Sequence, residues 1–391
     1  MNRHASVTLG LIIAGLSASA LLAGPITPPA GTVTPSYKTL GEVEPRTAIN
    51  ATNTPGDATT TYLITQPGSY YLTGNIAGTA GKAVITIATT DRVTIDLCGF
   101  SVTGGTYGVT TPLGQDGLTV RNGTISSQSG GAVYLPGCDH ARLESLTVLE
   151  GTGPTCITVG QFSIVRDCHV QGGANGILTS DSCIVQGCTV SGPSQQGFQG
   201  GNNCEVSNCI ADTCGSDGFK FTGAESTFSH CTARHCTSHG FEVGLNNLIE
   251  NCVTSYDNGS GFLLGPQCTI RDSVADNCSA QGIVIQGGGT VLNNQCKANG
   301  NGTAAGIWIQ GTTSLVEGNH CIANGYGIYV SGIDNVIIGN RCGANTQNNY
   351  FIMANNSYGP VVSPAYNAST VSGSSIPSNL GTTDPNTNFA F

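Results

Sequence analysis

The segment TSLVEGNHCIANGYGIYVSG, residues 313–332, aligns with the segment NCEVSNCIADTCGSDGFKFT, residues 203–222. In this alignment Asn319 falls on Cys209, and five residues later a second asparagine falls on a second cysteine. Both copies end in a Gly-apolar-x-apolar segment, GIYV in one and GFKF in the other. The chain therefore contains a repeated unit in which asparagine and cysteine occupy equivalent positions.

The repeated unit continues along most of the chain with a spacing of 20–25 residues. The aligned positions are Cys168, Cys188, Cys209, Cys231, Cys252, Ser273, Asn294, Asn319 and Asn340. A period near 21 with short β runs and no helical segment is typical of a solenoid. Fifty-six glycines and only 9% charged residues also suit β structure with many tight turns. We therefore predict an all-β parallel β-helix with about 11–12 rungs, where a rung is one turn of ~21 residues.

The C-terminal repeats carry the pattern I-x-x-N-x-I-x-x-N followed by G-I-x-V. It is clearest in VEGNHCIANGYGIYV, residues 316–330, and in IGNRCGAN, residues 338–345. In this pattern the chain resembles the right-handed parallel β-helix proteins of the pectate-lyase-like superfamily, over about residues 90–353. The resemblance implies a right-handed, single-stranded helix. It implies less about activity, because this fold hosts many functions.

Residues one period apart should lie above one another in neighbouring rungs, about 4.8 Å apart. We expect two structural ladders of such residues, with cysteine upstream and asparagine downstream. They are Cys168, Cys188, Cys209, Cys231, Cys252, Asn294, Asn319 and Asn340 in one, and Cys214, Cys236, Asn299, Asn324 and Asn345 in the other. One rung also matches the separation that a disulfide needs, as in Cys214–Cys236 or Cys183–Cys204. The alternative is buried thiols that fill space; either way the cysteines are structural.

The ends of the chain lack the repeat. Residues 1–23 have the parts of a secretory signal peptide, with cleavage near Ala20–Ala23, so we expect a secreted or extracytoplasmic protein. Residues 24–60 are predicted to be an extended linker, and residues 61–353 the β-helix, with cap strands in 61–92. Residues 354–391 should form a tail or cap. No later apolar run is long enough to span a membrane, and a net charge of −10 argues against nucleic acid as a partner.

Three large aromatic residues occupy one position of the Gly-apolar-x-apolar strands. Strand alternation turns x outward, and Trp308, Tyr329 and Phe351 are the x residues of three consecutive rungs. Flat aromatic faces suit stacking on sugar rings, and the family that the chain resembles often binds polysaccharide along such a face. We therefore assign these residues to carbohydrate binding. The alternative is that the C-terminal tail covers them.

A charged group occupies the same face in the middle of the chain. Lys220 and Glu242 are x residues of adjacent rungs, with Asp217 and His239 nearby. The structural interpretation is an exposed ion pair worth about 0–1 kcal/mol. The catalytic interpretation makes Lys220 or His239 a base with the carboxylates as partners. A lyase acting on uronic acids would use such a base to remove the C5 proton, and a cation, often calcium, to neutralise the carboxylate.

A comparison with polygalacturonases favours a lyase over a glycoside hydrolase. The segments SDG, residues 216–218, and SHG, residues 238–240, partly resemble their motifs, but their paired aspartates and Arg-x-Lys segment are absent. Inverting hydrolysis needs two suitably separated carboxyl groups. The segment HCTARHCTSHG, residues 230–240, lacks zinc spacing, so no metal site and no required cofactor are predicted apart from calcium in a lyase.

The sequence thus predicts a secreted β-helix protein that binds extracellular polysaccharide or a cell-surface glycan, with lyase-like cleavage at Lys220 as a further activity. The alternative function is a non-catalytic cell-surface or matrix scaffold for adhesion, because no complete catalytic set is present.

Overall fold

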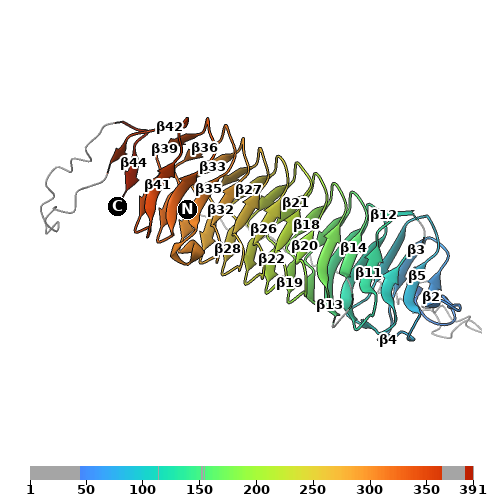
Figure 1. The fold of residues 1–391 in the computed structure, drawn as a ribbon. Helices are drawn as coiled ribbons and strands as arrows, with labels where there is room; N and C mark the ends of the chain where they lie inside the picture. The colour runs from blue at the N-terminus through green and yellow to red at the C-terminus, as the bar shows by residue number, and fades with distance from the viewer. Residues whose placement is uncertain (1–44, 113, 151–152, 154, 363–383, 391) are drawn as a thin grey trace, which may run out of the picture. The chain divides into compact units, whose positions relative to one another are not determined.

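The computed structural model describes residues 45–390 except 113, 151–152, 154 and 363–383. These residues form a parallel β-solenoid in which every rung adds one strand to a 14-stranded sheet, here sheet B (Figure 1). The solenoid therefore has about 14 rungs, more than the 11–12 predicted, because the irregular N-terminal segments also complete rungs. The predicted all-β parallel β-helix is confirmed.

Sheet B contains one strand from each rung. Its strands are β2 (Thr60–Ile64), β5 (Ala83–Ile87), β8 (Tyr107–Thr110), β11 (Gly131–Leu135), β14 (Thr155–Val159), β17 (Asn175–Thr179), β20 (Phe198–Gln199), β23 (Phe219–Phe221), β26 (Phe241–Val243), β29 (Phe262–Leu264), β32 (Ile283–Ile285), β35 (Ala305–Ile309), β38 (Tyr326–Val330) and β41 (Asn348–Ile352).

The 28-stranded sheet A supplies the other two sides of each rung, as two rows joined by β10 (Thr119–Ser126) and β13 (Arg142–Glu150). The first row also has β1 (Thr47–Ala48), β3 (Gly68–Tyr71), β6 (Val93–Asp96), β15 (Ile164–Arg166), β18 (Ile184–Gln186), β21 (Glu205–Ser207), β24 (Thr227–Ser229), β27 (Leu248–Glu250), β30 (Thr269–Arg271), β33 (Thr290–Leu292), β36 (Leu315–Glu317), β39 (Val336–Ile338) and β42 (Ser357–Tyr358).

The second row has β4 (Ile76–Ala77), β7 (Ser101–Thr103), β16 (His169–Gly172), β19 (Thr189–Ser191), β22 (Ile210–Asp212), β25 (Thr232–Arg234), β28 (Val253–Ser255), β31 (Val274–Asp276), β34 (Gln295–Lys297), β37 (His320–Ile322), β40 (Arg341–Gly343), β43 (Val361–Val362) and β44 (Asn388–Ala390). Two short strands, β9 (Gln115–Asp116) and β12 (Cys138–Asp139), pair separately, and η1 (Asn299–Gly302) is a short 3₁₀ segment.

The interior is a stack of apolar side chains from all three sides of the rungs. Equivalent residues are register partners, so Val206 pairs with Phe228 and Phe228 with Ile249. Four rings of sheet B, from Phe198 to Phe262, stack with centroids 4.5–5.0 Å apart. Each rung thus shares its apolar side chains with the next, since one rung alone could not bury them.

Every regular rung bends at three corners, and a residue with positive φ makes each bend. In one rung these are Asn203 (φ 53°), Asn208 (φ 55°) and Thr213 (φ 56°), and a buried cysteine follows each of them. Asparagine tolerates this left-handed conformation better than most residues, which explains why it recurs at the corners. The residue after each bend points inward and forms one of three corner columns.

The first corner column begins with cysteines at Cys168 and ends with asparagines. The buried Asn319 side chain accepts the Asn294 backbone N–H at 2.9 Å through Oδ1. Its Nδ2 donates to the carbonyls of Val291 at 2.8 Å and Glu317 at 3.0 Å. The second column repeats this geometry, with Asn324 accepting the Asn299 N–H at 2.9 Å. These amides satisfy backbone groups that each buried corner would otherwise leave unpaired.

Cysteine replaces asparagine in these columns because a thiol can make part of the same contacts. Cys209 Sγ lies 3.3 Å from the Ser207 carbonyl and 3.6 Å from the Val185 carbonyl, matching the two acceptors of Asn319 Nδ2. All 17 cysteines are free thiols, and all except Cys98 are buried. The two disulfides considered above are therefore absent from this structure. In-register stacking places the Cβ atoms of neighbouring column cysteines one strand spacing apart, at ~4.8 Å. This is farther than the Cβ–Cβ distance of ~3.8 Å that suits a disulfide.

A third corner column was not predicted. Its members are Ser163, Cys183, Cys204, Ser226, Asn247, Cys268, Ser314, Asn335 and Asn356. The contacts follow the same rule, since Ser226 N–H donates to Asn247 Oδ1 at 2.7 Å and Ser314 N–H to Asn335 Oδ1 at 2.8 Å. Serine, cysteine and asparagine are mixed along this column, so no single residue type marks it in the sequence.

Asp257 occupies the second column between Cys236 and Cys278. It is fully buried, and its Oδ1 accepts the Cys236 backbone N–H at 2.8 Å, as the asparagines of the column do. Its other oxygen contacts the Thr254 hydroxyl. Burial raises the pKa of Asp257, against the opposing effect of these hydrogen bonds. A protonated carboxyl group here has the shape and the donor of an asparagine amide.

We expect Asp257→Asn to stabilise the protein. The raised folded-state pKa means that the contribution of Asp257 is fully present below its unfolded value of about 3.8 and is lost as the pH rises through the folded-state pKa. The amide stays neutral and adds one N–H···O bond, worth about 1 kcal/mol. Urea unfolding at several pH values should show the largest gain at neutral pH. A variant that is less stable than the wild type at pH 7 would contradict this interpretation.

The N-terminal cap begins earlier than predicted. Residues 24–60 were expected to be a linker, but β1 pairs with β3, and Ile49 is buried in the core. Pro55 forms an antiparallel bridge with Tyr62 and so covers the free edge of β2. The predicted signal peptide and the first part of the linker, up to residue 44, lie outside the described residues.

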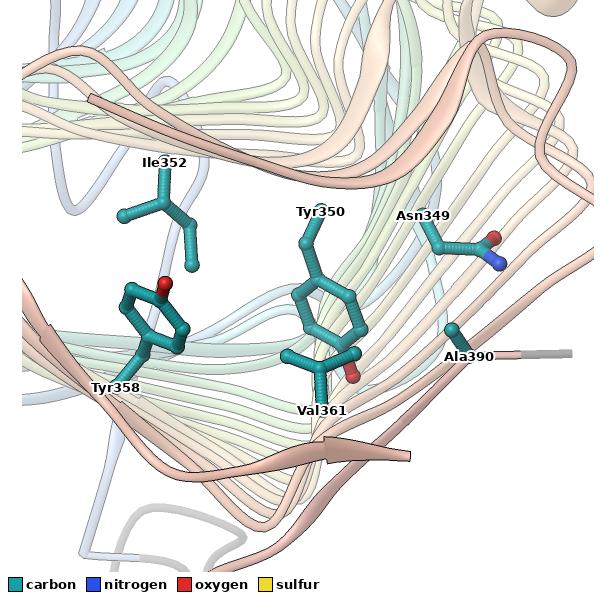
Figure 2. Close-up of a pocket in the computed structure, with 6 residues that line it drawn as sticks. All are labelled: Asn349, Tyr350, Ile352, Tyr358, Val361 and Ala390. Carbon is teal, nitrogen blue, oxygen red and sulfur yellow. The ribbon is translucent and has the colours of Figure 1, made fainter. Parts of the chain in front are cut away.

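Part of the C-terminal segment continues the solenoid. Strand β44 pairs with β40, and Asn388 accepts the Asn340 N–H at 3.0 Å, which adds one more member to the first column. A cavity of about 420 Å³ lies at this end. Figure 2 shows the residues that line it, Asn349, Tyr350, Ile352, Tyr358, Val361 and Ala390. It is the interior of the last rung, where another rung would pack. Residues 363–383 of the predicted tail lie outside the described residues.

Candidate carbohydrate-binding face

The predicted aromatic residues lie side by side on the outer face of sheet B. Trp308 in β35, Tyr329 in β38 and Phe351 in β41 are register partners on consecutive strands. The residues flanking each of the first two along the strand are buried in the core, so the strand alternation turns these aromatic rings outward. Phe351 is 38% exposed, and Trp308 and Tyr329 are half-buried.

A fourth aromatic residue, Tyr326, completes this aromatic patch of Trp308, Tyr326, Tyr329 and Phe351. The Tyr329 and Phe351 rings stack with centroids 4.9 Å apart at 15°, and Trp308 meets Tyr329 edge-on at 5.8 Å. The ring centroids of Tyr326 and Tyr329 lie 5.2 Å apart. The Trp308 indole N–H donates to Ser331 Oγ at 3.0 Å and fixes the ring orientation. The patch is thus a set of rings held in place by one another.

The aromatic patch borders a cavity of about 240 Å³. The cavity is lined by Gln281, Thr303, Ala304, Ala305, Trp308, Tyr326 and Tyr329. Flat rings beside neutral polar side chains are what a sugar-binding site requires, since rings contact the apolar faces of sugars and amides bind their hydroxyls.

Tyr326 was missed in the sequence because the strand alternation is interrupted beside it. Both Gly327 and Ile328 are buried, so residues 326 and 329 face outward although they are three positions apart. A Cβ on Gly327 would come within 2.4 Å of the Asn349 carbonyl oxygen, which is why glycine stands there. The described strands of the C-terminal segment, β42 to β44, pair within sheet A and not over the patch.

The structure also brings the predicted charged residues together. Lys220 and Glu242 are register partners on β23 and β26, with Lys220 Nζ 2.5 Å from Glu242 Oε2. Nζ also lies 3.3 Å from Asp217 Oδ2. The Glu242 hydrogen bond and the charges of both carboxylates raise the pKa of Lys220. A lysine held in its protonated form by two carboxylates is poorly suited to remove a proton.

Asp217 and His239 have a structural role that accounts for their positions. Asp217 Oδ1 accepts the His239 backbone N–H at 3.0 Å, and His239 Nδ1 accepts the Ser260 backbone N–H at 3.0 Å. This leaves the proton of a neutral His239 on Nε2, so neither ring nitrogen is an available base. Burial alone would raise the pKa of Asp217, but the Ser238 hydroxyl, this amide and Lys220 outweigh it and lower the pKa.

The same residues do not fit a calcium site. The carboxylates of Asp217 and Glu242 both face the Lys220 ammonium, which occupies the place that a bound cation would take. Among the described residues, no group of three or more His, Cys, Asp or Glu side chains could hold a metal ion. In that same part of the chain, no helix has the length and apolar character needed to cross a bilayer.

Comparisons with known proteins support the fold. A family model described as "Right handed beta helix region" matches residues 68–200, 112–244 and 180–319. The chain is similar to the siphovirus 9NA tailspike receptor binding domain, with 12% identity and a TM-score of 0.51, over 86% of this chain and 80% of that one. A search of curated protein sequences gave no significant match.

Two further solved structures resemble the chain less closely. The A-module of mannuronan C-5 epimerase AlgE4 from Azotobacter vinelandii has 14% identity and a TM-score of 0.45, over 74% of this chain and 91% of that one. The surface protein and adhesin PfbA from Streptococcus pneumoniae has 9% identity and a TM-score of 0.45, over 84% of this chain and 91% of that one. At such identities the likeness concerns the fold alone.

Proposed function

Because the chain belongs to the right-handed β-helix family, whose model matches between residues 68 and 319, we propose that it binds carbohydrate on the outer face of sheet B. The observation that carries this proposal is the aromatic patch beside its cavity of about 240 Å³. Four partly exposed aromatic rings gathered on one face form the kind of apolar surface patch that often marks a binding site. The proposal includes secretion, which depends on the signal peptide predicted for residues 1–23.

The ligand in this proposal is a neutral glycan. The described residues that line the cavity are all uncharged, so none of them supplies a cation to pair with a uronate carboxylate. The charged residues farther along the same face combine one ammonium with two carboxylates, and the whole chain has a net charge of −10. An anionic polymer would be repelled rather than steered toward this surface.

The proposal favours binding without cleavage at Lys220. A lyase needs an unprotonated base, and both Lys220 and His239 are engaged as described above. We therefore assign Lys220, Asp217 and Glu242 to an ion-pair network and His239 to a backbone contact. Incubation with alginate or polygalacturonate, with and without calcium, should give no unsaturated product absorbing in the ultraviolet.

Trp308→Ala is the direct test of the binding site. The chain contains a single tryptophan, so its fluorescence reports on the patch when the wild-type protein is titrated with soluble xylan, β-glucan or galactomannan. Affinity electrophoresis on the same polymers should show a loss of about tenfold or more in the variant, because truncating a central aromatic contact typically removes that much binding.

The control is Tyr256→Ala, which removes a 56% exposed ring at a corner outside sheet B. This variant should bind like the wild type. If no neutral polymer binds the wild-type protein, or if Trp308→Ala binds equally well, the carbohydrate proposal is wrong and the scaffold alternative is favoured.

A further inference from the structure

A second aromatic pair lies on the same face of sheet B, far from the patch. The rings of Tyr107 in β8 and Tyr134 in β11 stack with centroids 4.8 Å apart and an angle of 18°. Tyr134 is 36% exposed. The Tyr107 ring lies over the backbone of the next rung, where a Cβ on Gly130 would come within 2.8 Å of Tyr107 Cε1. Glycine at this position leaves room for the ring.

The pair repeats an arrangement found in the aromatic patch. Tyr107 is three residues before Thr110, the register partner of Tyr134. Tyr326 is likewise three residues before Tyr329, the register partner of Phe351. Tyr326 and Phe351 are also in ring contact, at 5.9 Å. The same two positions of neighbouring rungs therefore carry paired aromatic rings at two places along the solenoid.

The two places lie on the same sheet, along one series of register partners. Sheet B has eight strand-to-strand steps from β11 to β35, which is about 38 Å at ~4.8 Å per step. Between them lies a hollow of about 200 Å³, bordered among others by Glu242, Leu263 and Gln286. Glu242 and Leu263 occupy the same outward position as Tyr134 and Trp308.

We propose that Tyr107 and Tyr134 form a second binding site for the same glycan chain, so that the protein selects long neutral polysaccharides over short oligosaccharides. This inference rests on the proposed function of the aromatic patch. A chain that spans about 38 Å can occupy both sites, and the second contact is then intramolecular and strengthens binding. A shorter chain reaches only one site.

The test compares glycans shorter and longer than this separation. Xylan, β-glucan and galactomannan are hydrolysed partially and fractionated by length, and each fraction is measured with the wild type and with Trp308→Ala, Tyr134→Ala and Tyr107→Ala. We expect long fractions to bind the wild type roughly 10–100-fold more tightly than short ones. Each tyrosine variant should lose most of this preference for long fractions and still bind short fractions like the wild type. Trp308→Ala should bind both short and long fractions more weakly.

Two outcomes overturn the inference: equal affinity for short and long fractions, or tyrosine variants that keep the full gain. Either outcome leaves the proposed function intact if Trp308→Ala still weakens binding. If Trp308→Ala instead binds the glycans as tightly as the wild type, both the proposed function and this inference are wrong. Tyr256→Ala again serves as the control for removal of an exposed ring.

Discussion

Asn319→Ala should lower the free energy of unfolding by about 3 kcal/mol or more. Asn319 is fully buried, and its amide makes hydrogen bonds to the rungs on both sides. Alanine would leave the Asn294 N–H and the Val291 carbonyl without these partners inside the protein. Each buried unpaired group costs about 1–3 kcal/mol, and the missing side-chain atoms add a small cavity.

The matched control is Asn258→Ala, at an exposed position outside the corner columns, which should change stability by less than about 0.5 kcal/mol. Asn319→Cys should fall between the two, because a thiol can still approach the same carbonyls. Denaturant unfolding gives the free energies, and hydrogen exchange shows whether the amides of neighbouring rungs lose protection. Equal stability of Asn319→Ala and Asn258→Ala would refute the structural role of the column.

Phe219→Ala should be at least as damaging, with an expected loss of about 3–5 kcal/mol. Its ring is buried between Phe198 at 4.7 Å and Phe241 at 4.5 Å, nearly parallel to both. Removing it opens a cavity in the middle of the aromatic stack and breaks three ring contacts, two stacked and one edge-on with Phe228, each worth about 0.5–1.5 kcal/mol beyond the buried area. The rigid strands on either side cannot close such a gap.

Phe162→Ala is the matched control, because this phenylalanine is 50% exposed at a corner and stacks on the exposed side chain of His140. We expect a change of less than about 1 kcal/mol there. Thermal unfolding followed by far-ultraviolet circular dichroism should separate the two variants by several degrees. Similar melting temperatures for both would mean that the stack contributes little to stability.

The sequence was most informative where one residue type repeats in one column. Asparagines such as Asn319 and Asn340 recur at a fixed spacing because one amide can accept a buried corner N–H and donate to two carbonyls. Two of the three corner columns were therefore visible in the sequence. The third was not, because Ser226, Asn247 and Cys268 meet the same requirement with different side chains.

The candidate site was harder to predict because its properties depend on neighbours in space. The register placed Lys220 beside Glu242 correctly, but the pKa of the lysine is raised by Glu242 together with a second carboxylate, Asp217, whose contact the register does not show. Asp257 belongs to a buried column between Cys236 and Cys278, a position that its residue type does not indicate. Tyr326 escaped notice because two buried residues in succession interrupt the alternation at Gly327.

The corner columns also give the solenoid a polarity. The backbone N–H of a column residue donates to the side chain of the column residue in the following rung. Asn294 donates in this way to Asn319 Oδ1, and Asn340 to Asn388 Oδ1. Within the columns, shortening the protein from its C-terminal end would therefore strip acceptors from buried backbone N–H groups, whereas shortening from the other end would strip carbonyl acceptors from side-chain amides, as the loss of Val291 would from Asn319 Nδ2. Unmet donors are the rarer and costlier defect in proteins. In these columns a new C-terminal end thus leaves backbone donors without partners, and a new N-terminal end leaves side-chain donors without partners.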